Sequence, residues 1–264
     1  MPRAKRRLGQ HFLTDPRLLA RIADALDPRP SDTVLEIGPG PGGLTASLSG
    51  RAGRLVAIEK DRDLVPALRQ RYPAAIIVEA DALEADWHAL AGPRFLVAGN
   101  IPYNITSPLL DKALEPPRPE RIVFLVQKEV ADRVTAPPGG SIYGALSVGI
   151  QAVARAERLF TVPAGAFRPR PKVDSAVLRL TPLAEPLISD AEIAGFRRMV
   201  VGLFGFRRKQ LLRGLRELTG WTAERLEPVL RSLAIDPSSR PETLSPETFA
   251  ALLRALVDGG WTAR

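Results

Sequence analysis

Short apolar segments rich in β-branched residues recur along the first half of the chain. They cover residues 33–37, 55–58, 75–78, 95–98 and 122–126. Each is followed by a stretch typical of a helix or a turn, and this alternation predicts βαβ units and a parallel sheet with helices on both faces. A later stretch, VDSAVLRL (173–180), alternates apolar and polar positions and predicts an antiparallel strand.

The pattern changes near residues 182–186, beyond which it is helical. Ser189 with Glu192 fits a capping box, and Ser245 precedes a proline where a helix would begin. We therefore expect an α/β domain with a Rossmann-like sheet over residues 1–183 and a small helical domain over residues 184–264.

Composition excludes several kinds of chemistry. The chain has no cysteine and only two histidines, which argues against disulfides, thiolate catalysis and a histidine-based metal site. No apolar segment approaches membrane-spanning length, and the basic N-terminus is not followed by an apolar signal segment. We expect a cytoplasmic protein with no metal and no membrane partner.

The net charge of +8 is concentrated in three clusters. One lies near the N-terminus, one in a proline-rich loop, and one in a stretch without acidic residues. They consist of Arg3, Lys5, Arg6 and Arg7, then Arg168, Arg170 and Lys172, then Arg207, Arg208, Lys209, Arg213 and Arg216. Clustered basic residues favour a nucleic acid as the partner, so we expect the loop residues and Arg207–Lys209 to contact phosphates.

The stretch VLEIGPGPGGLT (34–45) predicts a strand that enters a glycine-rich turn and a helix. Gly38, Gly40 and Gly43 match the dinucleotide-binding pattern G-x-G-x-x-G. Glu59 follows at the end of the next strand, where such enzymes place the acid that binds ribose. A dinucleotide-dependent oxidoreductase is therefore one alternative.

Three features favour a nucleoside cofactor without phosphates. Glu36 would place a carboxylate beside a pyrophosphate, and Pro39 and Pro41 remove two backbone N–H groups from the turn. Asp81 ends the third strand and could accept from an adenine amino group, while Glu59 could hold a ribose. S-adenosylmethionine has this chemistry.

The motif Asn100-Ile101-Pro102-Tyr103 ends the fourth strand, at the same edge of the sheet. An exocyclic amino group of a base is a poor nucleophile because its lone pair is delocalised into the ring. The Asn100 side-chain oxygen and the Ile101 carbonyl could accept its two hydrogens, and Pro102 could aim that carbonyl. Tyr103 could stack on a flipped-out base, and Phe167 on its other face.

Together these motifs resemble the bacterial KsgA family, the small-subunit (16S) rRNA adenine N6-dimethyltransferases, over essentially the whole chain. The matching segments are GQHFL (9–13), EIGPGPGGLT, NIPY, SIYGALSV (141–148), FRPRPKVDSAVLRL, FRRKQLLRGL (206–215) and RPETLSPETFAALLRAL (240–256). Ile101 stands where the family usually has Leu. The resemblance implies a class I methyltransferase that dimethylates two adjacent adenines near the 3′ end of 16S rRNA during late small-subunit assembly.

The resemblance also implies roles for individual residues. Gln10, His11 and Leu13 would help to close the cofactor pocket, and Asn100 would touch both cofactor and target. The implied cofactor-binding residues are Gln10, His11, Leu13, Glu36, Gly38, Gly40, Glu59, Lys60, Asp81, Ala82 and Asn100.

Other functions stay open at this point. A macrolide-resistance methyltransferase would perform the same chemistry on large-subunit rRNA. A ribosome-assembly factor would act mainly by binding. For the favoured function the partner is 16S rRNA within the immature small subunit, and we expect a monomer.

Overall fold

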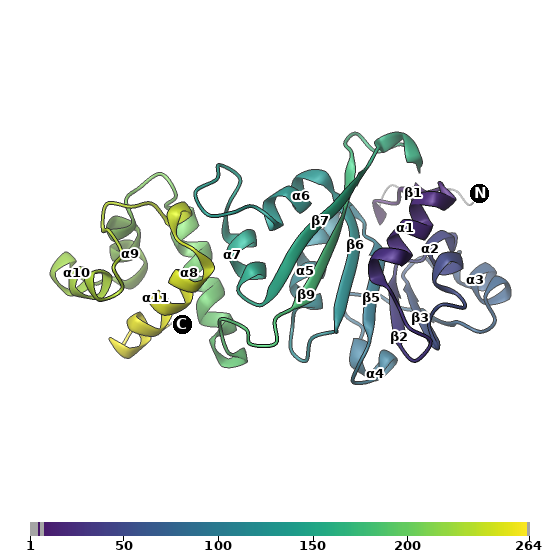
Figure 1. Cartoon of the computed structure of the whole chain (residues 1–264), viewed down its shortest axis with the longest axis horizontal. Helices are drawn as coiled ribbons and strands as arrows, with labels where there is room; N and C mark the ends of the chain where they lie inside the picture. The colour runs from purple at the N-terminus through teal and green to yellow at the C-terminus, as the bar shows by residue number, and fades with distance from the viewer. Residues whose placement is uncertain (1–4, 6–7, 263–264) are drawn as a thin grey trace. The chain divides into compact units, whose positions relative to one another are not determined.

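The structure, a computed structural model, describes residue 5 and residues 8–262. The chain divides into two units (Figure 1). Unit 1 combines the residues up to Ala131 with Ala156–Pro182, and unit 2 combines Asp132–Arg155 with the residues from Leu183 onward. Arg3, Arg6 and Arg7 of the N-terminal basic cluster lie outside the described residues.

A seven-stranded sheet with the order β4-β3-β2-β5-β6-β9-β7 forms the centre of unit 1. The strands are β2 (Thr33–Ile37), β3 (Arg54–Glu59), β4 (Ile76–Glu79), β5 (Leu96–Asn100), β6 (Arg121–Gln127), β7 (Ala154–Val162) and β9 (Ser175–Pro182). Strands β2 to β6 are parallel, whereas β9 runs antiparallel to β6. The predicted parallel sheet and late antiparallel strand are therefore confirmed.

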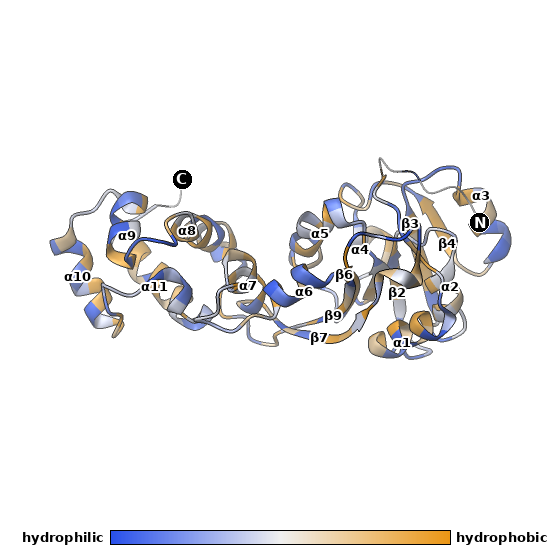
Figure 2. Ribbon diagram, turned by 90° about the horizontal axis from the view of Figure 1, so that it is seen from above, coloured by the Kyte–Doolittle hydropathy of each residue, from blue (hydrophilic) through white to orange (hydrophobic). Residues whose placement is uncertain are grey.

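Helices lie on both sides of this sheet. They are α1 (Pro16–Leu26), α2 (Gly43–Leu48), α3 (Val65–Arg71), α4 (Trp87–Ala91) and α5 (Thr106–Ala113). Figure 2 shows α1 and α2 on one side and α4 and α5 on the other. A sixth helix, α6 (Lys128–Val134), follows β6 directly.

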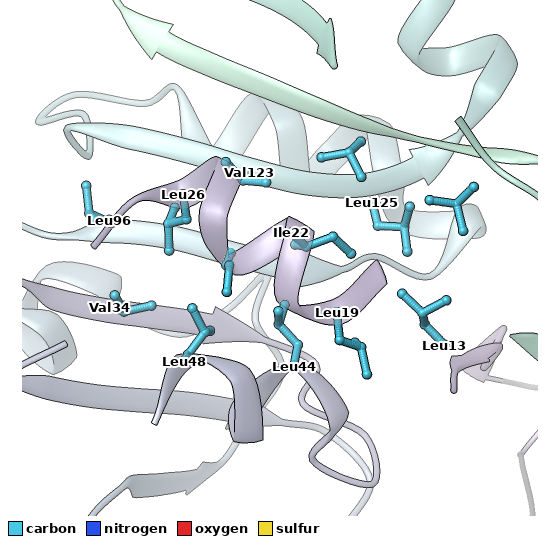
Figure 3. Packing of buried hydrophobic residues seen from close by; sticks show 14 of the residues in the cluster. Leu13, Leu19, Ile22, Leu26, Val34, Leu44, Leu48, Leu96, Val123 and Leu125 are labelled. Carbon is cyan, nitrogen blue, oxygen red and sulfur yellow. The ribbon is translucent and has the colours of Figure 1, made fainter. Parts of the chain in front are cut away.

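Helix α1 covers the middle of the sheet. Asp15 caps its first turn by accepting from two backbone N–H groups, and a proline occupies the first helical position. Its buried face presents Leu19, Ile22 and Leu26 to the strands (Figure 3). Burying each such side chain stabilises the fold by about 1.5–3 kcal/mol. Helix α1 therefore stabilises the sheet, and the predicted site lies at one edge of this sheet.

The segment before α1 forms a second, two-stranded sheet. Strand β1 (Phe12–Leu13) pairs antiparallel with β8 (Phe167–Arg168), and Leu13 lies opposite Phe167. The Thr14 backbone N–H donates to the Ala166 carbonyl at 3.1 Å and extends this pairing. The N-terminal segment is thus attached to the proline-rich loop.

Unit 2 is helical. Its helices are α7 (Ala145–Gln151), α8 (Ile193–Gly205), α9 (Leu211–Thr219), α10 (Ala223–Ser232) and α11 (Pro246–Asp258). The capping box of Ser189 with Glu192 and the N-cap of α11 by Ser245 are both present, as the sequence predicts. Among the described residues, no helix combines the length and apolar character needed to cross a membrane.

Residues 132–155, which the sequence analysis placed in the first domain, belong to unit 2. Tyr143 explains why, because its side chain is fully buried and its hydroxyl donates to the Leu244 carbonyl at 2.9 Å. The Gly139 N–H donates to the Glu242 carbonyl at 2.7 Å. This long-range packing is not visible in local periodicity.

Candidate active site

One cavity lies at the carboxyl ends of β2 to β5, where parallel sheets of this type bind ligands. It brings together every predicted catalytic and cofactor-binding residue except Phe167. These are Gln10, His11, Leu13, Glu36, Gly38, Gly40, Glu59, Lys60, Asp81, Ala82, Asn100, Ile101, Pro102 and Tyr103. The sequence analysis missed the apolar residues Leu8, Phe12 and Leu19, which also line the cavity.

The glycine-rich turn needs glycine for its backbone conformation. Gly38 and Gly40 have φ angles of +65° and +58°, in the left-handed region that side chains disfavour. A Cβ atom at Gly40 would also lie 3.1 Å from the Phe12 ring. At Gly38 the corresponding space is open, so a bound group could approach the backbone closely.

Residues 38–42 leave no backbone N–H to bind a pyrophosphate. The N–H of Gly38 donates to the Ile58 carbonyl (2.9 Å), that of Gly40 to Glu59 Oε2 (2.9 Å) and that of Gly42 to the Pro39 carbonyl (2.9 Å). Pro39 and Pro41 have no N–H to give. Because phosphate binding by such a loop depends on these donors, the geometry disfavours the dinucleotide alternative.

Two acids at neighbouring strand ends are held in place by hydrogen bonds. Glu59 is 5% exposed and accepts from the N–H groups of Gly40 and Asp61, at 2.9 and 2.7 Å. Burial raises the pKa of this carboxyl. Asp81 pairs with Lys60, and that hydrogen bond lowers the pKa of Asp81. Both carboxylates therefore lie in fixed orientations on the wall of the cavity.

Glu36 lies on β2 at the base of the glycine-rich turn and is 1% exposed. Burial raises its pKa to about 8, and the charge of Glu59 adds to this shift. Its Oε2 atom has no hydrogen-bond partner among the described residues. Hydrogen bonds from Thr45 lower the pKa in part, so the raised value reflects burial of the carboxyl group. The held carboxylates of Glu59 and Asp81 fit the ribose hydroxyls and the adenine amino group of S-adenosylmethionine, and the open space at Gly38 admits a bound group close to the backbone.

Asn100 is held in one orientation by the N-terminal segment. Its Nδ2 group donates to the backbone carbonyl of His11 at 2.8 Å, which turns Oδ1 the other way. The next peptide is fixed as well, because the Ile101 N–H donates to the Leu125 carbonyl at 3.0 Å. No described group donates to the Ile101 carbonyl. The two predicted acceptors for an amino group therefore come from a rigid part of the chain.

Tyr103 follows in a short 3-10 helix, Tyr103–Ile105, and is partly buried. One face of its ring stacks on His11, with 5.5 Å between the ring centroids. Its hydroxyl lies 2.7 Å from the buried hydroxyl of Ser175, and burial raises the pKa of the phenol. Ser175, which the sequence analysis did not single out, thus anchors the aromatic ring that was predicted to stack on a base.

Phe167 does not lie where the sequence analysis expected it. Its side chain is fully buried in the core cluster beneath α1 and does not line the cavity. The pairing of β8 with β1 explains this position, because it directs the side chain toward the sheet. In this structure the second face of a bound base would therefore not be covered by Phe167.

The predicted phosphate-binding residues differ in exposure and in whether their charged groups already contact other parts of the protein. Arg170 and Lys172 are exposed, whereas the Arg168 guanidinium donates to the carbonyls of Gly165 and Phe167. In unit 2, Arg208 is exposed and Lys209 lies over the Phe206 ring. The Arg207 guanidinium donates instead to the Ser141 carbonyl at 2.6 Å and the Gly140 carbonyl at 3.3 Å. Arg207 is therefore engaged in holding a loop.

Comparison with known proteins agrees with this geometry. Residues 1–256 match the family model for ribosomal RNA adenine dimethylase. The chain belongs to this family. Its relatives include the ribosomal RNA small subunit methyltransferase A of Geobacter metallireducens, which is 46% identical over 97% of this chain and 96% of the relative. The same protein of Myxococcus xanthus is 43% identical over 96% and 91%.

Solved structures of similar enzymes confirm the fold. A dimethyladenosine transferase from Plasmodium falciparum superposes with a TM-score of 0.85 at 25% identity, covering 95% of this chain and 99% of the other. The 23S rRNA methyltransferase ErmE superposes with a TM-score of 0.74 at 31% identity, covering 93% and 99%. The predicted methyltransferase fold and the predicted class of enzyme, an adenine dimethyltransferase of ribosomal RNA, are therefore confirmed.

Proposed function

We propose that the protein transfers methyl groups from S-adenosylmethionine to the N6 amino groups of two adjacent adenines near the 3′ end of 16S rRNA. Its substrate would be the immature small subunit, during late assembly. The identity of 46% with a small-subunit methyltransferase, against 31% with ErmE, supports this choice over large-subunit rRNA. Because bacterial small subunits mature in the cytoplasm, we propose that the protein acts there, as a monomer.

The observation that carries the proposal is the orientation of Asn100. With Nδ2 committed to the His11 carbonyl, Oδ1 is available to accept one hydrogen of an adenine amino group. The Ile101 carbonyl is available to accept the other. Holding both hydrogens turns the nitrogen lone pair out of conjugation with the ring, toward the methyl carbon.

S-adenosylmethionine supplies an electrophilic methyl carbon when it is bound. On transfer, the bond from N6 to this carbon would form as the carbon–sulfur bond breaks, and the electron pair of that bond would stay on sulfur. The nitrogen loses one proton, which Asn100 need not take because water can accept it. The carboxylates of Glu59 and Asp81, held at two strand ends, would bind the ribose hydroxyls and the adenine amino group of the cofactor.

The target base would stack on the face of Tyr103 that His11 does not cover. Phosphates on either side of the base would meet the exposed cations Arg170 and Lys172. Arg208 and Lys209 of unit 2 would bind phosphates elsewhere on the RNA. Arg207 would support this surface by holding the loop at residues 140–141.

A pair of variants at Asn100 tests the proposal. Asn100→Ala removes the acceptor, and we expect methyl transfer to fall by about a hundredfold or more while binding of under-methylated small subunits is kept. Ser107→Ala, an exposed residue on α5, is a matched surface control that should retain activity. Full methylation by Asn100→Ala would contradict the mechanism. Unchanged particle binding without methylation would also separate catalysis from any role in assembly.

A further inference from the structure

Asp61 is a buried carboxylate that does not line the cavity. Its side chain is 2% exposed, and it follows the ribose-binding candidate Glu59 by two positions. Its carboxylate accepts from Lys5 Nζ at 2.5 Å and from Gln10 Nε2 at 3.1 Å. The third donor is the N–H of Asp63 in the same turn, at 3.2 Å. Both side-chain partners therefore come from the N-terminal segment, more than fifty positions away in the chain.

We call residues 8–13 the N-terminal strap. The strap lines the cavity, and its far end pairs with β8. At its centre the His11 carbonyl accepts from Asn100 Nδ2, and the His11 ring stacks on Tyr103. The strap thus contacts Asn100 and Tyr103, the two side chains of the motif that we expect to contact the target base.

The two ends of the strap are held differently. At its C-terminal end the β1–β8 ladder and the buried side chains of Phe12 and Leu13 attach it to the core. Toward its N-terminal end Gln10 donates to Asp61, and Lys5, which precedes the strap, donates to the same carboxylate; the Gln10 side chain also accepts from the Lys5 N–H at 2.7 Å. His11 lies between these attachments, and its ring nitrogen Nδ1 also lies 2.8 Å from the Pro169 carbonyl, so loss of the N-terminal attachment would remove one of the contacts that hold its carbonyl.

We propose that Asp61 is a positioning residue for methyl transfer, which anchors the N-terminal strap so that the His11 carbonyl fixes the orientation of Asn100. This inference rests on the proposed function of Asn100. Loss of this anchor loosens the N-terminal half of the strap, and the Asn100 amide then samples orientations in which Oδ1 no longer faces the target amino group. Asp61 itself touches neither substrate nor cofactor, and it acts through Gln10 and His11.

Asp63 provides a matched control within the same turn. Its carboxylate also contacts Lys5 Nζ, at 2.5 Å, but it is 64% exposed and does not contact Gln10. Removing it takes away one exposed ion pair, which contributes little in water, and leaves the bond between Asp61 and Gln10 in place. A change in net charge or in Lys5 pairing alone would affect both variants alike.

The experiment compares full-length wild type with Asp61→Ala, Asp63→Ala, Gln10→Ala and the double variant Asp61→Ala/Gln10→Ala. Single-turnover methyl transfer to under-methylated small subunits gives the chemical rate, and sedimentation gives particle affinity. We expect Asp61→Ala to lower the rate by roughly ten- to a hundredfold with particle affinity within about twofold of wild type. Asp63→Ala should stay within about twofold in both measurements.

Non-additivity distinguishes the anchor from a general effect on stability. At saturating S-adenosylmethionine, which removes any effect of Gln10 on cofactor binding, the double variant should be no slower than Asp61→Ala alone if Asp61 acts through Gln10. If Asp61→Ala does not fold, Asp61→Asn keeps the shape and an acceptor for Gln10 but removes the charge that holds Lys5, and its rate should fall below that of wild type. A folded Asp61→Asn and Asp61→Ala at the wild-type rate, or independent effects of Asp61 and Gln10, would overturn the proposal. Wild-type protein that does not methylate small subunits would instead refute the proposed function. The role of Asp61 is tested separately, by the ratio of the variant's methyl-transfer rate to the wild-type rate.

Discussion

The buried carboxyl of Glu36 makes the stability of unit 1 depend on pH. Its ordinary pKa is 4.5, and burial raises it to about 8 in the folded protein. The folded chain therefore binds more protons than the unfolded chain between these values. The stability that this group contributes is fully present below pH 4.5 and is lost as the pH rises through 8.

The size of the effect follows from the shift. One pKa unit corresponds to about 1.4 kcal/mol, so a shift from 4.5 to about 8 costs the folded state about 5 kcal/mol once Glu36 is ionised. A domain is typically stable by roughly 5–15 kcal/mol, so this cost is a large part of its free energy of unfolding. Glu36→Gln removes the ionisation and keeps the shape. We expect the variant to lose less stability than wild type between pH 5 and pH 9.

Urea unfolding at several pH values measures this difference. Trp87 lies in unit 1 with Glu36, whereas Trp221 and Trp261 lie in unit 2. In a background in which the latter two are phenylalanine, fluorescence reports unit 1. The change in the free energy of unfolding with pH is compared between the variants, so any pH-independent cost of the new amide cancels.

The same substitution at an exposed strand end is the control. Glu79→Gln makes the same change at an exposed position at the end of β4, where folding does not remove the side chain from water, so the pH profile of this variant should follow wild type. Parallel pH profiles for wild type and Glu36→Gln would refute the reasoning, because they would show that Glu36 ionises at no cost in the folded protein.

Three further predictions concern the turn, the aromatic ring and the cations. Gly40→Ala should destabilise unit 1 by about 1–2 kcal/mol in urea unfolding, since φ is +58° and the new Cβ would crowd the Phe12 ring at 3.1 Å. Tyr103→Phe should retain most methyl transfer because the ring remains, whereas Tyr103→Ala should lose roughly tenfold or more in a single-turnover assay. The binding constant K for particles falls as salt rises. Replacing Arg170 and Lys172 with Gln should make the slope of log K against log salt less steep by about 1.5. An unchanged slope would show that these side chains do not contact phosphates.

The sequence predicts the sheet well because its strands are short, buried and apolar. Periodicity locates β2 to β6 within a residue or two, and the turn chemistry around Gly38 identifies the ligand-binding edge. Motif positions at successive strand ends then place Glu36, Glu59, Asp81 and Asn100 around one cavity, because parallel strands bring their carboxyl ends together.

Long-range contacts account for what the sequence could not show. The burial of Phe167 depends on pairing between β1 and β8, which lie more than a hundred and fifty positions apart. The commitment of Arg207 depends on a loop sixty-six positions earlier in the chain. Asp61 resembles any solvated turn carboxylate until its partners, Lys5 and Gln10, are seen. A side chain's composition and spacing indicate its chemistry, but its partners decide whether that chemistry is available.

The most direct test of the proposed function is methyl transfer from labelled S-adenosylmethionine to three substrates. These are under-methylated small subunits, under-methylated large-subunit rRNA and a free adenine-rich oligonucleotide, with the modified nucleoside identified in each product. We expect N6,N6-dimethyladenine at two adjacent adenines near the 3′ end of 16S rRNA and in neither of the other substrates. Label confined to large-subunit rRNA, or tight particle binding without transfer to any substrate, would contradict this expectation.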